Sequence, residues 1–412
     1  MKHIIVLGDG MADHAVARIG GRTPLQFARK PYMDRIARDG RCGMLVTVPE
    51  GFVPGSEVAN TAILGYDLHK VYEGRGPLEA ASIGYEMSPE DMAIRCNLIT
   101  IGDGRIITHN GGNISTEDAR VLLDYLNRHL SDERVRFVTG IQYRHLLVVK
   151  GGSKHIVCCP PHDHPDELWE PLLVMPEPNA PREEGRMSAE ETAALLNSLI
   201  LASQELLPAH PYNKARAAAG LRGANSIWPW SGGYRPSMKP LREVYPSIRS
   251  GSAISAVDLI HGIGHYAGLD VVHVEGATGL ADTNYEGKAA AAIDALRRQD
   301  FVFVHVEATD EAGHDGDLEL KIKAIEYLDR RLIAPIYEEV AAWPEPVCMA
   351  VLPDHPTPVE QRVHVSEPVP FAIWHRGMHP DKVRVYDEIS CQEGSFGLLK
   401  LQQFMDTFMA IR

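Results

Sequence analysis

The amino-acid sequence predicts an α/β fold: a mostly parallel sheet sandwiched by helices, with an inserted, smaller α+β domain. Three observations lead to this prediction. Several apolar runs end abruptly in acidic or histidine residues, helical patterns separate these runs, and one central stretch has a different, short-stranded pattern. Continuous apolar strands that alternate with helices are typical of parallel sheets covered on both faces.

Three apolar runs are the predicted central strands. The first runs from Ile4 to Leu7, and a Gly-Asp-Gly turn at residues 8–10 stops it. The runs within residues 300–311 and 346–355 have the same shape and the same polar ending. Functional groups of parallel sheets lie just beyond the carboxyl ends of the strands. We therefore expect the ends of these three runs to meet at one edge of the sheet.

Helical patterns lie between these strands. Residues 286–298 and 318–340 repeat apolar side chains at helical spacing, so both are predicted to form crossover helices. Such crossovers are what parallel strands require, which supports the α/β class.

Residues 90–170 have the pattern of short strands around one helix. That helix begins near Ser115, where Ser115 and Asp118 resemble a capping box with Asp in place of Glu. The stretch 160–186 is rich in Pro, Glu and Asp and is predicted to lead back into the larger domain. We predict a core domain of residues 1–89 and 171–412 and an inserted domain of residues 90–170.

The composition limits the partners. The 412 residues include 41 lysines and arginines and 55 aspartates and glutamates, which gives a net charge of −14. A surface of this sign repels polyanions, so we expect neither nucleic acid nor a membrane as a partner. The six cysteines form no C-x-x-C pair, and the chain has no run of about 18 apolar residues. We expect a cytoplasmic protein, and the sequence indicates no particular oligomeric state.

Acidic and histidine side chains follow the predicted strands. Any one of them alone is more often a helix cap or a surface residue. Together, three carboxylates and three imidazoles at one sheet edge cannot stay buried without a compensating cation. Two divalent metal ions would supply that charge. The candidate ligands are Asp9, Asp310, His314, Asp354, His355 and His364.

The ligand types limit the metal. Asp310 and His314 are four residues apart, which places both side chains on one face of a helical turn. Mixed carboxylate and imidazole ligation suits Mn²⁺, Zn²⁺ or Fe²⁺ better than Mg²⁺ alone, because Mg²⁺ prefers oxygen ligands and retained waters. The residues alone leave the choice among the first three open.

Ser56 is the candidate nucleophile. Pro54 and Gly55 form a turn before it, and the segment from Val58 to Leu64 is a candidate helix whose N-terminus faces the serine. The alternative is that Ser56 is only the N-cap of that helix. Beside a divalent cation, a serine hydroxyl has a depressed pKa and needs no histidine base.

A phosphate substrate would also need positive protein groups near the cations. The candidates are Arg75, Arg95, Arg222 and Lys288, each of which lies beside a glycine or a turn. Most arginines are solvated surface residues, so each assignment alone is weak. Neither G-x-G-x-x-G nor G-x-x-x-x-G-K-[ST] occurs, and a dinucleotide or ATP cradle of those types is not predicted.

Six segments together resemble the archaeal-type, cofactor-independent phosphoglycerate mutases of the alkaline phosphatase superfamily. They are GDGM, PGSEVANTAILGYD, GRGPLEA, GATGLADTNYEGKA, TDEAGHDGD and DHPTP, and the resemblance covers essentially the whole chain. It implies that 3-phosphoglycerate and 2-phosphoglycerate are interconverted through a phosphoserine on Ser56, with the inserted domain closing over this small phosphorylated substrate.

The resemblance also implies roles for individual residues. One metal would be held by Asp9, Ser56, Asp354 and His355, and the other by Asp310, His314 and His364. Mn²⁺ is expected first, with Zn²⁺, Fe²⁺ and Mg²⁺ as alternatives. Arg75 and Lys288 would act with Ser56 in catalysis. The expected substrate-binding set is Arg75, Arg95, Asn97, Asn60, Arg222 and Lys288.

The chain departs from the family pattern in the substrate clamp. Glu57 to Asn60 stand where Asp-Thr-Ala-His is usual, and His109 to Asn113 replace a segment with three arginines. These changes are similar to a bacterial subgroup proposed to phosphorylate homoserine. A homoserine-directed phosphotransferase or a phosphatase on the same site is therefore the alternative enzyme. A metal-binding module without catalysis is the alternative from another class.

Overall fold

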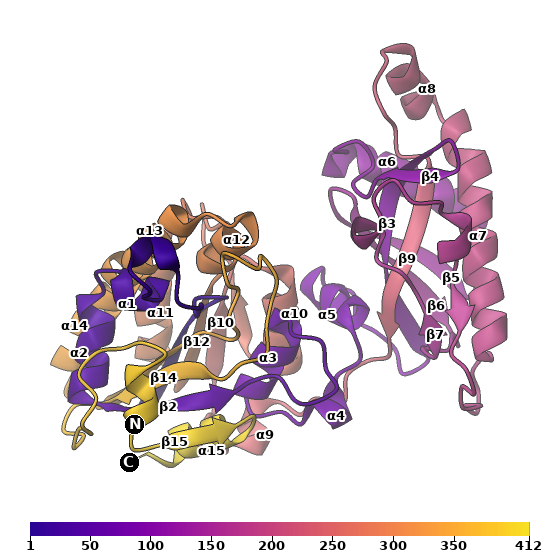
Figure 1. Ribbon diagram of the computed structural model, residues 1–412. Coiled ribbons are helices and arrows are strands. Elements are labelled where there is room, and N and C mark those ends of the chain that lie inside the picture. Colours follow the sequence, from indigo (N-terminus) through magenta and orange to yellow (C-terminus); the bar gives the residue numbers. More distant parts are fainter. Residues whose placement is uncertain (412) are drawn as a thin grey trace. The chain divides into compact units, whose positions relative to one another are not determined.

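The computed structural model describes residues 1–411, which divide into two compact units (Figure 1). The first unit comprises Met1–Tyr72 and the described residues from Ser237 onward, and the second comprises Glu73–Pro236. The predicted boundaries at residues 90 and 170 both fall inside the second unit, so the sequence-based insert is too short at both ends.

The first unit contains an eight-stranded sheet in the order β11-β10-β12-β1-β13-β14-β2-β15. Five of its seven neighbouring pairs are parallel, and the two pairs that β14 makes are antiparallel. This confirms the predicted mostly parallel sheet. The strands are β1 (Lys2–Gly8), β2 (Arg41–Val46), β10 (Gly251–Ile254), β11 (Asp270–Val272), β12 (Phe301–Val306), β13 (Val347–Leu352), β14 (Val369–Trp374) and β15 (Gly397–Lys400).

The three predicted central strands are β1, β12 and β13, and β1 lies between the other two. In their register, Leu7 pairs with both His305 and Leu352. The carboxyl ends of the three strands therefore lie level, as expected. Residues that directly follow Gly8, Val306 and Leu352 are placed at the same edge of the sheet.

Helices connect and cover these strands. The predicted crossover over 286–298 is α11, and the pattern over 318–340 is one continuous helical run in which a π-helical segment, η4, separates α13 from α14. The helices are α1 (Pro24–Phe27), α2 (Pro31–Asp39), α3 (Ser56–Ile63), α4 (Leu68–Val71), α9 (Leu241–Val244), α10 (Asp258–Tyr266), α11 (Tyr285–Arg298), α12 (Ala308–Asp315), α13 (Leu318–Tyr327), α14 (Ala334–Ala342) and α15 (Gln403–Ala410), with the short helices η1 (Ala17–Ile19), η4 (Leu328–Ile333) and η5 (Ser390–Glu393).

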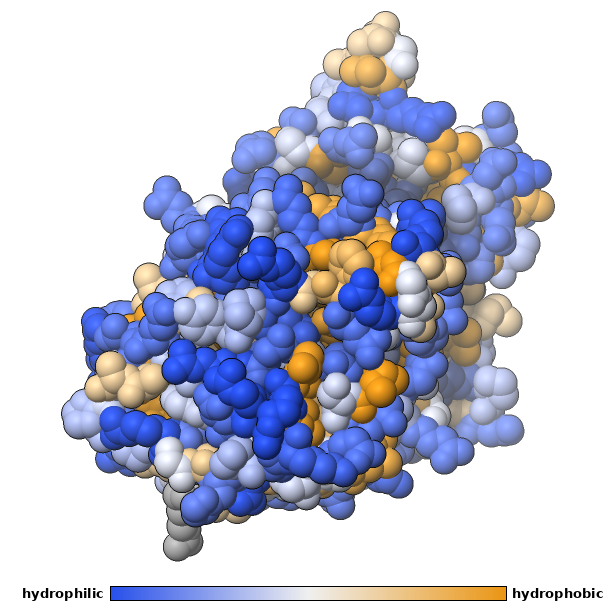
Figure 2. Space-filling model, turned by 60° about the vertical axis from the view of Figure 1, so that its left-hand side comes forward, coloured by the Kyte–Doolittle hydropathy of each residue, from blue (hydrophilic) through white to orange (hydrophobic). Residues whose placement is uncertain are grey.

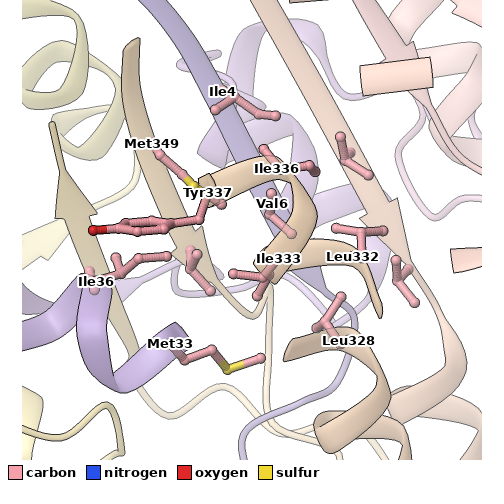
Figure 3. Packing of buried hydrophobic residues seen from close by; sticks show 14 of the residues in the cluster. Ile4, Val6, Met33, Ile36, Leu328, Leu332, Ile333, Ile336, Tyr337 and Met349 are labelled. Atoms are coloured by element: carbon pink, nitrogen blue, oxygen red, sulfur yellow. The ribbon is translucent and has the colours of Figure 1, made fainter. Parts of the chain in front are cut away.

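The main core lies on one face of this sheet. In Figure 3, Ile4 and Val6 of β1 point toward side chains of α2, η4 and α14, among them Ile36, Leu332 and Ile336. All five side chains are fully buried. Burying an aliphatic side chain of this size stabilises the fold by about 1.5–3 kcal/mol. Because strand side chains alternate, Leu7 and its partner His305 point to the opposite face.

The second unit is an α+β structure with its own core. Its sheet has the order β4-β3-β6-β5, and β9 pairs antiparallel with residues 93–99 of β3, on the edge opposite β6. The strands are β3 (Asp91–Gly102), β4 (Arg105–Thr108), β5 (Val135–Ile141), β6 (Arg144–Lys150) and β9 (Ser226–Gly233), with a separate pair β7 (Ile156–Val157) and β8 (Met175–Pro176). The helices are α5 (Arg75–Ser82), α6 (Thr116–Leu130), α7 (Ala189–Ala209), α8 (Pro211–Ala218), η2 (Pro161–Asp163) and η3 (Glu170–Leu172). Helix α6 begins as predicted, because the Asp118 N–H donates to the Ser115 side chain at 3.1 Å.

The boundary prediction failed because residues 160–186 do not lead back to the first unit. After them the chain forms α7, whose Leu196, Ile200 and Leu207 are buried in the core of the second unit. It then forms β9, which completes the sheet beside β3. The polar, proline-rich composition of residues 160–186 predicted a linker between domains, but this stretch connects elements within the second unit.

On the face that Figure 2 shows, hydrophilic side chains predominate and hydrophobic ones form small patches. None of the helices within residues 1–411 combines the length and the apolar composition needed to cross a bilayer.

Candidate metal centre

The candidate ligands do meet at the carboxyl edge of the parallel strands. Asp9 directly follows β1, and Asp354 and His355 follow β13. Asp310 and His314 lie on α12, which begins two residues after β12. The six ligands form two groups, Asp9–Asp354–His355 and Asp310–His314–His364, which we call the buried group and the open group.

The buried group surrounds the Ser56 hydroxyl. Ser56 Oγ lies 3.4 Å from Asp9 Oδ1 and 3.3 Å from His355 Nε2. His355 Nε2 is also 3.5 Å from both Asp9 Oδ1 and Asp354 Oδ2. Asp9, Asp354 and His355 are all 0% exposed. One nitrogen and two carboxylate oxygens thus converge beside a hydroxyl, away from solvent.

Buried carboxylates this close need positive charge. Burial, together with the nearby carboxylate of Asp354, raises the pKa of Asp9 well above its usual value. A cation between the two carboxylates would remove that penalty, since buried charges are stable only when compensated. The donor set of the buried group therefore fits a divalent cation.

Asp354 is held in a fixed orientation. Its Oδ1 accepts the N–H groups of Gly10 at 3.0 Å and of His355 at 2.9 Å. Its Oδ2 accepts from Asn60 Nδ2 at 2.9 Å, and the same amide nitrogen donates to the Ser56 carbonyl at 2.8 Å. Asn60 was predicted to bind substrate: its amide NH₂ group donates to Asp354 and Ser56, and its Oδ1 is buried without a hydrogen-bond partner among the described residues.

The open group is less buried, because the side chains of His314 and His364 are partly exposed. Asp310 Oδ2 lies 3.2 Å from His314 Nε2, and Asp310 Oδ1 lies 3.3 Å from His364 Nε2. The two imidazole nitrogens His314 Nε2 and His364 Nε2 are only 2.8 Å apart. As expected from the spacing of four residues, Asp310 and His314 project from the same face of α12.

The imidazole tautomers show that the open group must hold either a proton or a cation. His314 Nδ1 is 3.0 Å from the Arg362 carbonyl and His364 Nδ1 is 3.3 Å from the Pro54 carbonyl. A carbonyl only accepts, so both Nδ1 atoms carry the proton, and in the neutral rings both Nε2 lone pairs face each other. A proton or a cation must lie between them. Accordingly, hydrogen bonding to Asp310 raises the pKa of His314 to about 9.

Thr357 links the two groups. Its hydroxyl hydrogen-bonds to Asp310 Oδ1 and lies 3.2 Å from His355 Nδ1. When the hydroxyl donates to the carboxylate, it accepts the proton on His355 Nδ1, which leaves His355 Nε2 as a lone pair directed at the buried group. One threonine therefore fixes the orientation of a ligand in each group.

Ser56 is the first residue of α3, and Gly55 is its N-cap. The alternative that Ser56 serves only as the cap is therefore wrong: the cap position is Gly55, in extended conformation and without a side chain. At this place the serine hydroxyl lies beside the partial positive charge of the helix N-terminus, which favours an incoming anion.

Sequence reasoning missed His305 and Thr357. His305 Nε2 lies 2.8 Å from Asp9 Oδ2, and His305 is 0% exposed. A lone histidine inside the apolar run of β12 was the available signal, because a buried imidazole must find a hydrogen-bond partner. For Thr357 we find no signal beyond its place between two predicted ligands.

The predicted clamp residues are distributed over both units. Lys288 is buried in the first unit, and its Nζ donates to the His305 carbonyl at 3.1 Å. Burial lowers the pKa of Lys288 to about 8, and Glu307 acts in the opposite direction.

In the second unit, Arg95 pairs with Glu79 at 3.1 Å and stacks on Trp230. Asn97 accepts from Trp230 Nε1 at 3.1 Å. Arg75 begins α5, and its backbone N–H donates to the Ser231 hydroxyl at 3.1 Å. Arg222 is exposed. The contacts thus join Arg95 and Asn97 through one tryptophan.

Fold and site together define a class: an α/β protein whose sheet edge holds two candidate cation-binding groups around a serine at a helix N-terminus. A family model described as 2,3-bisphosphoglycerate-independent phosphoglycerate mutase matches residues 37–213. The chain belongs to this family, since it is 47% identical to the mutase of that name from Methanosarcina acetivorans over 100% of both chains.

Other relatives agree. A probable 2,3-bisphosphoglycerate-independent phosphoglycerate mutase from Geobacter sulfurreducens is 44% identical and covers 91% of this chain and 90% of its own. A solved protein from Pyrococcus horikoshii has a TM-score of 0.82 and 27% identity, and covers 99% of this chain and 96% of its own. The cofactor-independent phosphoglycerate mutase from Thermoplasma acidophilum has a TM-score of 0.68 and 26% identity, with 99% of both chains covered.

Proposed function

We propose that the chain interconverts 3-phosphoglycerate and 2-phosphoglycerate through a phosphoserine on Ser56. One observation carries the proposal: Ser56 Oγ lies within 3.4 Å of both Asp9 and His355, in a chain that matches a named mutase from end to end. The names of the relatives favour this reaction over the homoserine-directed phosphotransferase or the phosphatase. A cytoplasmic location is part of the proposal, and all six cysteines are free thiols.

Two divalent cations belong to the proposal, with Mn²⁺ first and Zn²⁺, Fe²⁺ and Mg²⁺ as alternatives. The buried group with Ser56 would hold one and the open group the other, because mixed oxygen and nitrogen donors suit these metals. When bound, the cations would supply positive charge to the phosphoryl oxygens and lower the pKa of the serine hydroxyl.

In the first step, Ser56 Oγ forms a bond to phosphorus while the bond from phosphorus to the 3-oxygen of the substrate breaks. Overall, the proton that Ser56 loses is the one that the departing oxygen gains when it becomes the 3-hydroxyl of glycerate. Asp9 Oδ1 and His355 Nε2 orient the hydroxyl for this attack. The first turn of α3 adds the partial positive charge of its backbone amides.

In the second step, the 2-hydroxyl of the retained glycerate attacks the phosphoserine. As its oxygen bonds to phosphorus, the bond from phosphorus to Ser56 Oγ breaks and the proton of the 2-hydroxyl returns to Ser56, which yields 2-phosphoglycerate. Two transfers in series predict net retention of configuration at phosphorus. Because glycerate must stay bound between the steps, the protein needs groups that hold its carboxylate.

For these groups we propose Arg75, Arg95, Asn97 and Lys288. Arg95 is 7% exposed, and its Nε has no hydrogen-bond partner within residues 1–411. A buried guanidinium nitrogen without a partner favours an anionic ligand. Arg222 stays in the expected set, but its exposure adds no support.

A coupled assay tests the function. Purified protein with Mn²⁺ and 3-phosphoglycerate, and without 2,3-bisphosphoglycerate, should produce 2-phosphoglycerate, which enolase converts to an absorbing product. S56A should show no turnover, and EDTA should abolish it. A phosphoryl mass shift on Ser56 should be trapped after brief exposure to substrate. Release of inorganic phosphate, or transfer to homoserine, without 2-phosphoglycerate would overturn the proposal.

A further inference from the structure

His305 has no role in the reaction as proposed, although it contacts the centre. It is the second-last residue of β12, paired in register with Leu7 of β1, and it is completely buried. Its Nε2 lies 2.8 Å from Asp9 Oδ2, while Asp9 Oδ1 is the oxygen nearest Ser56. The two oxygens of one carboxylate thus have different partners.

The hydrogen bonds around His305 determine its tautomer. The Val257 N–H donates to Ser255 Oγ at 3.0 Å, so the hydroxyl proton of Ser255 is left to be donated. Ser255 Oγ lies 3.2 Å from His305 Nδ1, which accepts that proton. His305 therefore carries its own proton on Nε2 and donates it to Asp9 Oδ2. The opposite tautomer would set a lone pair against an ionised carboxylate.

This arrangement leaves one oxygen of Asp9 available. Oδ2 is occupied by the His305 N–H, so only Oδ1 faces Ser56 Oγ and His355 Nε2, at 3.4 and 3.5 Å. Asp354 has a similar arrangement, in which Asn60 donates to Oδ2. Outer-shell donors of this kind fix the orientation of a ligand and tune its affinity for metal.

We propose that His305 is a positioning residue, which holds the Asp9 carboxylate so that it binds the cation beside Ser56 through Oδ1 alone. The inference rests on the proposed cation site and deepens it. It assigns a role to the Val257–Ser255–His305 chain of hydrogen bonds, which reaches the centre from the side of β10 and α10.

A third cation between Asp9, His305 and Glu307 is the competing explanation, because these residues offer ligand atoms within 4.8 Å of one another. The tautomer disfavours it. His305 Nε2 carries the proton that it donates to Asp9 Oδ2 at 2.8 Å, so it has no lone pair to offer a cation. The ammonium group of Lys288 also donates to the His305 carbonyl and brings positive charge there.

The test compares His305→Phe with His305→Gln in the full-length chain. Phenylalanine fills the volume without a donor, while the glutamine amide reaches the place of Nε2 and restores it. His3→Phe is the matched control, because His3 is buried in the same sheet at the opposite end of β1. EDTA-treated proteins are titrated with Mn²⁺ alone by calorimetry, and kcat and KM for 3-phosphoglycerate are measured separately.

We expect His305→Phe to weaken one Mn²⁺-binding step by about 10- to 100-fold and leave the other unchanged. His305→Gln should recover most of that loss, and His3→Phe should bind like the wild type. In activity, kcat should fall with little change in KM. An unchanged second Mn²⁺-binding step and an unchanged thermal unfolding temperature would show that the variant is folded. A loss that came only from misfolding would alter both.

Wild-type binding in His305→Phe would overturn the proposal, as would equal weakening of both steps, a third Mn²⁺ that is lost in this variant, or no Mn²⁺ binding by the wild type. A wild-type protein that binds two Mn²⁺ but shows no mutase activity would instead overturn the proposed function. In that case, selective weakening by His305→Phe would still support the positioning role.

Discussion

The buried group and the open group lie at the same sheet edge but differ in how the negative charge of their carboxylates can be compensated. Asp9, Asp354 and His355 have no exposed surface, whereas the side chains of His364 and His314 are 19% and 37% exposed. The buried group has two carboxylates, and the open group has one carboxylate and two imidazoles. A buried pair of carboxylates depends on a cation, while exposed imidazoles can take a proton instead.

The largest expected effect is the fall in kcat when one ligand is removed from either group. Asp354→Asn should lower kcat by about 10⁴-fold, or roughly 5.5 kcal/mol, because it removes charge beside the serine hydroxyl. His314→Asn should cost about 10²-fold, because a solvent-accessible ligand position can be filled by water. Steady-state kinetics at saturating Mn²⁺ measures both.

Asp294→Asn is the control for this pair, since Asp294 is an exposed carboxylate that pairs only with Arg298 among the described residues. It should behave like the wild type. Equal losses in Asp354→Asn and His314→Asn would show that the difference in burial between the two groups has no functional consequence.

The next effect concerns the loops that carry the buried group. Lys321 is fully buried, and its Nζ donates to Asp13 Oδ2 at 2.7 Å, to the Thr357 carbonyl at 2.7 Å and to the Ala12 carbonyl at 3.2 Å. It thus joins the loop after β1 to the loop after β13. Lys321→Met removes the only ammonium group paired with the buried Asp13 among the described residues and leaves that carboxylate with the backbone N–H groups of His14 and Val359, so the free energy of unfolding should fall by about 4 kcal/mol.

Chemical denaturation measures this loss. Lys323→Met is the matched control, because Lys323 lies on the same helix with an exposed side chain, and its free energy of unfolding should change by less than about 0.5 kcal/mol. A loss below about 1 kcal/mol in Lys321→Met would mean that Asp13 finds another partner.

Whether a feature of the fold or the site could be predicted depends on whether a local sequence pattern encodes it. The parallel strands and the ligands at their ends were predictable. An apolar run that stops at Asp9 or Asp354 indicates both a buried strand and a polar side chain at the carboxyl end of that strand. Helix α12 was predictable from the spacing of Asp310 and His314. The extent of the second unit was not, because the pairing of β9 with β3 joins residues more than 100 positions apart, and no local pattern encodes it.

The contacts of the supporting residues were not predictable either. His305 and Thr357 act through hydrogen bonds to ligands on other elements, and although a histidine inside an apolar run signals that some partner is needed, no local pattern identifies that partner. The contact of Asn60 with Asp354 could not be predicted for the same reason, because the two residues lie 294 positions apart. The residue type of a ligand can be read from the local sequence, whereas the hydrogen bonds that orient the ligand depend on contacts made by the three-dimensional fold.

A third buried carboxylate extends the comparison, because Asp329 needs no cation. Its Oδ1 accepts the N–H groups of Met33 at 2.7 Å and Tyr32 at 3.1 Å, at the start of α2. Burial raises the pKa of Asp329 to about 6, above the unfolded value near 4. The folded state therefore binds the proton more tightly, and this stabilisation is full below about pH 4 and lost as the pH rises through 6.

Asp329→Asn isolates this contribution, because its amide oxygen keeps both backbone hydrogen bonds and does not titrate. Between pH 4 and pH 7, the stability of the wild type relative to Asp329→Asn should fall by at most about 3 kcal/mol. Urea unfolding across that range, with and without Mn²⁺, measures it. A relative stability that rises with pH would contradict the assigned direction.

The smallest effect is the difference in cation affinity between the two groups. Two carboxylates attract a divalent cation more strongly than one, and burial reduces screening by water. We expect two Mn²⁺-binding steps whose dissociation constants differ by about tenfold, or 1.4 kcal/mol, with the open group weaker. During dilution into EDTA, the open group should therefore release its cation first.

His314→Asn identifies the weaker binding step, because only that step should change in this variant. If His314→Asn instead altered the tighter step, exposure would not determine affinity at this centre, and the bridge that Thr357 forms between the two groups would be the dominant influence.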